Sequence, residues 1–157
     1  MKGRAMLCLT AILICTAPAM ADPAAIVKTH SEAFEKAANA CNVPAMLELY
    51  QNDATIIWPG QGEVATGKAA IEKIMKEQCS GGAKLSLKPV SSDARAIGRD
   101  YIINVGMWDS TVPGPDGKPM TARVRTTELI HKSHGKWRYV IDHASIGVPP
   151  PPPPAKQ

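Results

Sequence analysis

The chain has 157 residues, a formal net charge of +4, and hydrophobic side chains at 45% of its positions. This length fits a single domain with a core of ordinary size. The charge is too small to indicate a nucleic acid or an anionic membrane surface as a partner.

The first 21 residues have the pattern of an export signal. Lys2 and Arg4 precede an apolar run at residues 6–14, and residues 19–21 have a small-x-small cleavage pattern. The run is far shorter than the ~20 apolar residues of a spanning helix. Neither cysteine of this segment follows a small residue, so no lipid anchor is indicated. We therefore expect cleavage near Ala21, a periplasmic or secreted protein without a stable membrane anchor, and a net charge that falls from +4 to +2 as Lys2 and Arg4 are removed.

The mature chain would keep two cysteines, Cys41 and Cys79. In an oxidising compartment two cysteines allow a single intramolecular pairing, so we predict a Cys41–Cys79 disulfide that stabilises the fold by about 3–4 kcal/mol. The alternative is two buried free thiols. The spacing is unlike a metal knuckle or a C-x-x-C redox motif, so we predict no metal site from these residues.

Helical periodicity marks the first half of the mature chain. Apolar residues recur every three or four positions over residues 23–40, which predicts a helix with one buried stripe. Pro44 opens a short second helix that is expected to continue to Tyr50. A β-branched stretch at residues 53–58 predicts the first strand, and residues 68–78 predict a third helix.

The second half of the chain has the pattern of strands separated by turns. They are expected at residues 83–90, 93–98, 101–111, 121–132 and 136–146. Helices followed by hairpin-linked strands indicate an α+β fold, in which a curved antiparallel sheet is covered by the N-terminal helices and encloses a cone. The domain would span residues 22–148. Six consecutive prolines then give residues 149–157 the composition of a stiff, solvated polyproline tail.

Several short motifs resemble a known superfamily in their order and spacing. They are LELYQNDAT at residues 47–55, followed by Pro59, GKAAI at residues 67–71, TELIHKSHGKW at residues 127–137 and HAS at residues 143–145. Together they resemble the nuclear transport factor 2-like, or SnoaL-like, superfamily. The last hairpin is especially similar to the calcium/calmodulin-dependent kinase II association-domain branch and its uncharacterised bacterial relatives. The resemblance covers essentially the whole mature chain.

The resemblance implies a cone-shaped α+β fold, a cystatin-like roll, with an apolar pocket and dimers formed through the outer face of the sheet. The superfamily includes steroid isomerases, epoxide hydrolases, dehydratases, polyketide cyclases and noncatalytic assembly modules. A fold that carries so many activities does not determine the function, so the residues inside the cone must decide it.

The steroid isomerases of this superfamily use a carboxylate base, a tyrosine and a protonated acid. The positions that resemble theirs hold Trp58, Phe34 and Thr127 in this chain. Tryptophan and phenylalanine cannot accept the proton or hold the oxyanion in that way, and threonine is a weak substitute. We therefore expect that mechanism to be absent.

Strand alternation, combined with the resemblance, gives a set of expected pocket residues. Arg123, Arg125 and Thr127 share one strand face, and the resemblance makes it the pocket face. The other expected ligand-binding residues are Phe34, Trp58, Asn104, Trp108 and Asp142. Two inward arginines would favour a small anionic ligand such as a carboxylate. The alternative is that Arg123 and Arg125 are solvated residues on the outer face.

Two functions remain open. The first is an exported, homodimeric pocket protein that binds a small amphipathic or anionic molecule without chemistry. The second is a small periplasmic enzyme of the isomerase, dehydratase or hydrolase type, which would use Asp142, Arg123 or Arg125 as an electrophile, and His30 as a proton carrier. The missing acid–base set favours the first, and a pocket that holds only arginines and aromatics would rule out the second. No cofactor is expected.

Overall fold

The structure, a computed structural model, describes residues 22–59, 64–80, 85–114 and 116–147. The predicted export signal at residues 1–21 and the predicted proline tail at residues 149–157 lie outside the described residues. Within the described ranges, no helix is long and apolar enough to cross a membrane.

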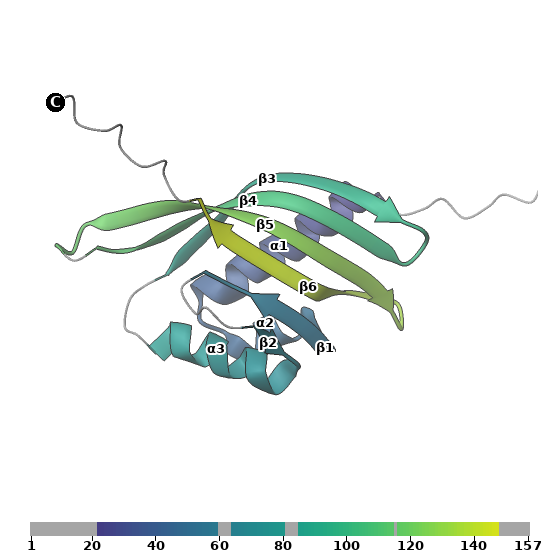
Figure 1. Cartoon of the computed structure of the whole chain (residues 1–157), viewed down its shortest axis with the longest axis horizontal. Coiled ribbons are helices and arrows are strands. Elements are labelled where there is room, and N and C mark those ends of the chain that lie inside the picture. The colour runs from purple at the N-terminus through teal and green to yellow at the C-terminus, as the bar shows by residue number, and fades with distance from the viewer. Residues whose placement is uncertain (1–21, 60–63, 81–84, 115, 148–157) are drawn as a thin grey trace, which may run out of the picture.

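The helices of the described ranges are α1 (Pro23–Asn39), α2 (Val43–Leu47) and α3 (Lys68–Ser80) (Figure 1). α1 begins where the Asp22 carboxylate accepts a hydrogen bond from the Ala24 amide at 3.0 Å, which caps its N-terminus. α2 is shorter than predicted. Tyr50 starts a strand instead, because its backbone pairs with that of Tyr139 in the sheet.

Six strands of the described ranges form one sheet. They are β1 (Tyr50–Ile57), β2 (Ala65–Thr66), β3 (Ser86–Ile97), β4 (Tyr101–Pro113), β5 (Pro119–Ser133) and β6 (Lys136–Ile146), in the order β2-β1-β6-β5-β4-β3. Neighbouring strands are antiparallel, except that β1 and β6 are parallel. The sheet is therefore mixed, whereas the sequence predicted an antiparallel one.

The number of strands before β4 also differs from the prediction. Two strands were expected at residues 83–90 and 93–98, but one strand runs from Ser86 to Ile97 beside β4. Its register shifts between Pro89 and Ser91. A proline has no amide hydrogen for the ladder, and an irregularity on an edge strand accommodates it.

The helices cover the inner face of the sheet. α1 lies across the strands and packs against β3, while α3 packs against β1 and β2 (Figure 1). The fully buried core residues come from all of these layers, namely Val27, Tyr50, Ile56, Ile71, Met75, Ile102, Ile130 and Tyr139. The predicted α+β cone is confirmed.

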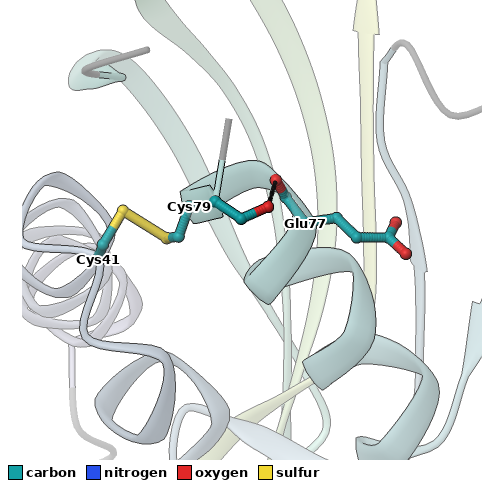
Figure 2. The surroundings of a disulfide bond; sticks show 4 residues. Cys41, Glu77 and Cys79 are labelled. Atoms are coloured by element: carbon teal, nitrogen blue, oxygen red, sulfur yellow. Dashed lines mark hydrogen bonds between the residues drawn. A yellow bond between two sulfur atoms is a disulfide. The ribbon is translucent and has the colours of Figure 1, made fainter. Parts of the chain in front are cut away.

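The predicted Cys41–Cys79 disulfide is present (Figure 2). It joins the turn after α1 to the last turn of α3, with Cα atoms 5.6 Å apart. Cys41 has a φ of 50°, a left-handed conformation that turns the chain from α1 towards α2. The bridge thereby fixes α3 to the helix that covers the sheet.

Candidate functional site

A cavity of about 490 Å³ lies inside the cone, between α1 and the inner face of β4, β5 and β6. We call it the cone cavity. Aromatic side chains form its inner walls, and aliphatic residues of β4, β5 and β6, including Val112, Val124 and Ile146, extend the lining. Cys41 and Cys79 are also part of the wall. The volume suits a small organic molecule.

Phe34 is the centre of the aromatic wall. Its ring centroid lies 6.0 Å from those of Trp58 and Trp108 and 6.4 Å from those of Tyr50 and Tyr139. All four contacts are edge-to-face, the arrangement in which the positive edge of one ring meets the negative face of another. This packing holds the wall rigid around the polar groups described below.

Asp142 lies at the inner end of the cavity and is 6% exposed. Its Oδ2 accepts hydrogen bonds from the Tyr50 hydroxyl at 2.6 Å and from Trp58 Nε1 at 2.9 Å. Burial raises the pKa of Asp142, and these two donors oppose the rise because they favour the carboxylate. Burial also raises the pKa of Tyr50, so its hydroxyl remains a donor.

Glu128 is the cross-strand neighbour of Asp142 and is 3% exposed. Its Oε2 accepts a hydrogen bond from Asn104 Nδ2 at 2.8 Å, and the Ser92 hydroxyl fixes that amide by donating to Asn104 Oδ1 at 2.7 Å. Burial, followed by the charge of Asp142, raises the pKa of Glu128 to about 7. Its polar neighbours, Asn104 first, oppose the rise.

The two carboxyl groups therefore have different protonation preferences. Asp142 accepts two hydrogen bonds on one oxygen, from a hydroxyl and an indole, whereas Glu128 accepts mainly from the Asn104 amide, with Thr126 and Trp108 as lesser polar neighbours. Two neighbouring buried carboxyls do not both ionise readily, and the pKa of Glu128, raised to about 7, favours Glu128 as the group that keeps a proton below that pH. The cavity thus contains a base and an acid side by side.

The structure corrects the expected face of β5. Arg123, Arg125 and Thr127 were expected to point into the cone, but all three are exposed on the outer face. The inward residues of this strand are the even-numbered ones, including Val124 and Glu128. Arg123 forms an ion pair with Asp109 on the same outer face, with Nε and Oδ1 2.6 Å apart. The expectation that Arg123 and Arg125 line the pocket is therefore wrong, and the alternative, two solvated arginines on the outer face, is what the structure shows. A guanidinium is much less costly to place in water than in an apolar cavity.

The remaining expected site residues are divided between two places. Phe34, Trp58, Trp108 and Asp142 line the cone cavity, and Asn104 lies behind Glu128. His30 does not line it. The edge of its ring packs against Tyr139 with centroids 4.5 Å apart, on the other side of the aromatic wall. The set Asp142, Arg125 and His30, expected for an enzyme, is thus not assembled.

No group of three or more metal-ligating side chains occurs among the described residues. The polar groups that line the cone cavity are two carboxyls, hydroxyl and indole donors and the Gln78 amide, with no Lys, Arg or His among the described lining residues. The rest of the lining is mostly apolar.

Comparison with known families identifies the class of the chain. The family model described as SnoaL-like domain matches residues 27–149, so the chain belongs to the SnoaL-like domain family. A search of curated protein sequences finds no match.

Solved structures agree with this assignment at the level of the fold. A protein from Xanthomonas campestris, classed as a calcium/calmodulin-dependent protein kinase II association domain, has a TM-score of 0.72 at 19% identity, over 88% of this chain and 98% of that one. A ketosteroid isomerase-like protein from Erwinia carotovora has a TM-score of 0.67 at 19% identity, over 80% of this chain and 96% of that one. A protein from Streptomyces avermitilis, classed as a dehydratase of the NTF2-like family, has a TM-score of 0.72 at 14% identity, over 81% of this chain and 97% of that one.

Sequence reasoning missed three residues of the site, namely Tyr50, Glu128 and Tyr139. A signal for Glu128 was available, because it alternates with Val124 and Ile130 on one face of β5. The role of Tyr50 had no local signal, since Asp142 is 92 residues away in the chain.

Proposed function

We propose that the cone cavity is the active site of an enzyme that transfers protons on a small, uncharged and mostly apolar substrate, in an isomerisation or a dehydration. The observation that carries this proposal is the pair of neighbouring buried carboxyls, Asp142 and Glu128, which differ in hydrogen bonding and hence in protonation. General acid–base catalysis requires one group of each kind within reach of one substrate.

In an isomerisation, the Asp142 carboxylate takes a proton from a carbon next to a carbonyl group. The electron pair of the broken C–H bond forms a C=C bond, and the carbonyl oxygen takes the proton of Glu128. This step gives the enol of the substrate, a protonated Asp142 and an ionised Glu128. Return of the Asp142 proton to a different carbon, and of the enol proton to Glu128, completes the reaction and restores both groups. Tyr50 and Trp58 orient the Asp142 carboxylate throughout.

The similar structures add limited support. Their names include a ketosteroid isomerase-like protein and a dehydratase, which are activities of this chemical kind. At identities of 14–19% they support the fold and leave the activity to the residues.

Deuterium exchange tests the proposal without knowledge of the substrate. The protein is incubated in D₂O with a panel of uncharged cyclic ketones and enones, and loss of the α-proton signal is followed by ¹H NMR. We expect catalysed exchange for at least one member. Asp142→Asn should lower the rate about 10²–10⁴-fold, while the surface control Arg125→Gln should not. Equal rates for the unmodified protein and Asp142→Asn would contradict the proposal.

A second candidate is binding of an amphipathic cation without chemistry. It is favoured by the aromatic walls and the absence of any cationic lining residue among the described ones, since aromatic faces and carboxylates both attract ammonium groups. Calorimetric binding of a protonated arylalkylamine such as 2-phenylethylamine that depends on Glu128, together with no exchange of any ketone, would favour this candidate over the enzyme.

We also propose that the protein is a homodimer formed through the outer face of the sheet. This face exposes the apolar side chains of Val105 (53%), Met107 (41%) and Ile141 (42%). Exposed apolar side chains on one face of a sheet are typical of a protein interface. Val105→Lys should convert a dimer to a monomer in native mass spectrometry, and an unmodified protein that is already monomeric would contradict this assignment.

Finally, we propose that the protein is exported and cleaved near Ala21. The Cys41–Cys79 disulfide supports an oxidising compartment. N-terminal sequencing of the protein from the periplasmic fraction should begin near Asp22. Recovery of the intact N-terminus from the cytoplasm would contradict this proposal.

A further inference from the structure

A second hollow lies outside the cone, between α1, the residues before β1 and the start of β6. We call it the α1–β6 groove, and its volume is about 590 Å³. Residues from three segments form most of its lining, namely Ile26 and His30 of α1, Leu49 before β1, and Lys136, Trp137 and Arg138 of β6. None of its lining residues lines the cone cavity. The contact between the rings of His30 and Tyr139 lies between the two hollows.

Two cations, Lys136 and Arg138, line the β6 side of this groove, and a third, Lys132 of β5, lies over the Trp137 ring without lining it. Arg138 is half-buried, and its Nε donates to the Glu48 carbonyl oxygen at 3.2 Å, which holds the guanidinium in place. Lys132 Nζ lies 5.9 Å from the centre of the Trp137 ring, and Lys136 is next to that ring in the chain. Among the described residues, none of the three has a carboxylate within 4.0 Å.

His30 lines the inner part of the groove. It is 8% exposed, and its Nε2 lies 3.3 Å from the Leu49 carbonyl oxygen. A carbonyl oxygen only accepts, so Nε2 carries a proton. The ring is neutral near pH 7 because the pKa of His30 is lowered. Burial lowers the pKa of His30 to about 4; the hydrogen bond to Leu49 opposes this, and the charge of Arg138 adds to the lowering. Arg138 and His30 thus line the same groove, and the charge of Arg138 disfavours a second charge on the His30 ring.

Two carboxylates also line the groove, and they limit its charge. Asp22 is used as the cap of α1, where its carboxylate accepts from the Ala24 amide. Glu48 is exposed and contributes its backbone carbonyl to Arg138. Because the Glu48 carboxylate is not within ion-pair distance of a cation, it weakens the positive field but does not neutralise a particular side chain.

We propose that the α1–β6 groove is a second binding site, for a small organic anion with an apolar or aromatic body and one carboxylate head. The head would contact Arg138 and Lys136, and the body would lie on Ile26, Leu49 and Trp137. A guanidinium next to an apolar surface suits such a ligand, because it supplies two parallel hydrogen-bond donors to a carboxylate. This site is independent of the chemistry proposed for the cone cavity.

Three probes with the same body and different heads test the site, namely phenylacetate, phenylacetamide and 2-phenylethylamine. Binding to the protein is measured by NMR titration, with the His30 ring signals as the local reporter. We expect phenylacetate to bind at least tenfold more tightly than the other two. Arg138→Gln should weaken it about tenfold. Arg138→Lys, which keeps the charge, should weaken it less, and Glu48→Gln should strengthen it.

Two controls locate the binding. Lys88→Gln removes one positive charge from β3, outside the groove, and should leave phenylacetate binding unchanged. Asp142→Asn should also leave it unchanged if the groove, and not the cone cavity, holds the probe. Equal affinity for all three probes, preference for the amine, or full binding in a folded Arg138→Gln variant would overturn the proposal. Failure of this site would leave the deuterium-exchange result for the cone cavity unaffected.

Discussion

The cone cavity and the α1–β6 groove lie on opposite sides of one aromatic contact, His30 against Tyr139, and have opposite chemistry. The cavity contains two carboxyls that burial drives towards the neutral acid. The groove is lined by an exposed Lys136, a half-buried Arg138 and a buried, neutral histidine. Strand β6 supplies residues to both, with Asp142 in the cavity and Arg138 in the groove. Depth of burial, more than residue type, decides which groups keep their charge.

Removal of the disulfide should have the largest effect on stability, and it should leave the ligand binding of the groove unchanged. Cys41 and Cys79 line the cone cavity and close a loop of 38 residues. Cys41→Ser with Cys79→Ser should lower the free energy of unfolding by about 3–4 kcal/mol, measured by urea denaturation. Groove binding of phenylacetate should survive in the folded double variant. A loss below about 1 kcal/mol would contradict a structural role for the bridge.

Glu128→Gln should change the pH dependence of stability. In the folded protein the pKa of Glu128 is raised from 4.5 to about 7. The unfolded chain therefore releases this proton first as the pH rises. The free energy of unfolding falls by up to about 3 kcal/mol between pH 4.5 and pH 8 as a result. The variant lacks this loss, so it should be more stable than the unmodified protein at pH 8 and not at pH 4.5. Parallel stability curves for the two proteins would contradict the assignment.

His30→Gln should change the pH dependence in the opposite direction. The folded pKa of His30 is lowered from 6.5 to about 4, so the unfolded chain takes up this proton first as the pH falls. The free energy of unfolding of the unmodified protein should then fall by about 2 kcal/mol between pH 7 and pH 5, and that of the variant should not. Glutamine keeps a donor for the Leu49 carbonyl oxygen. Thermal unfolding at both pH values measures the difference, and an equal loss in both proteins would show that His30 is not the responsible group.

Arg125→Ala should have the smallest effect. Arg125 is exposed on the outer face of β5, away from both hollows, and forms no ion pair with a described residue. Its replacement should change the free energy of unfolding by less than about 0.5 kcal/mol and should leave deuterium exchange unchanged. Loss of exchange in this variant would restore an arginine to the chemistry.

The fold followed from the sequence because its signals are local. Helical periodicity in residues 23–40 and strand patterns from residue 83 onward indicated the α+β cone, and two cysteines allowed one disulfide. The parallel pairing of β1 with β6 joins segments far apart in the chain, and nothing in either segment specifies it.

The site followed only in part, for two physical reasons. Alternation along β5 separates Arg125 from Glu128, but it does not say which face is inward. The apolar neighbours Val124 and Ile130 mark the inner face, and the cost of burying two arginines argues for the same choice. The hydrogen bonds of Asp142 depend on long-range packing, so its partners Tyr50 and Trp58 emerged only from the structure.

The most direct test of the central claim is a pH titration of the side-chain carboxyl carbons of Glu128 and Asp142 by ¹³C NMR. We predict that Glu128 titrates near pH 7, where its pKa is raised to about 7 by burial and by the neighbouring charge. Asp142→Asn should lower the Glu128 pKa, because it removes that charge. Titration of both carboxyls in the ordinary range of about 4–4.5, with no effect of Asp142→Asn on Glu128, would contradict the proton-sharing pair.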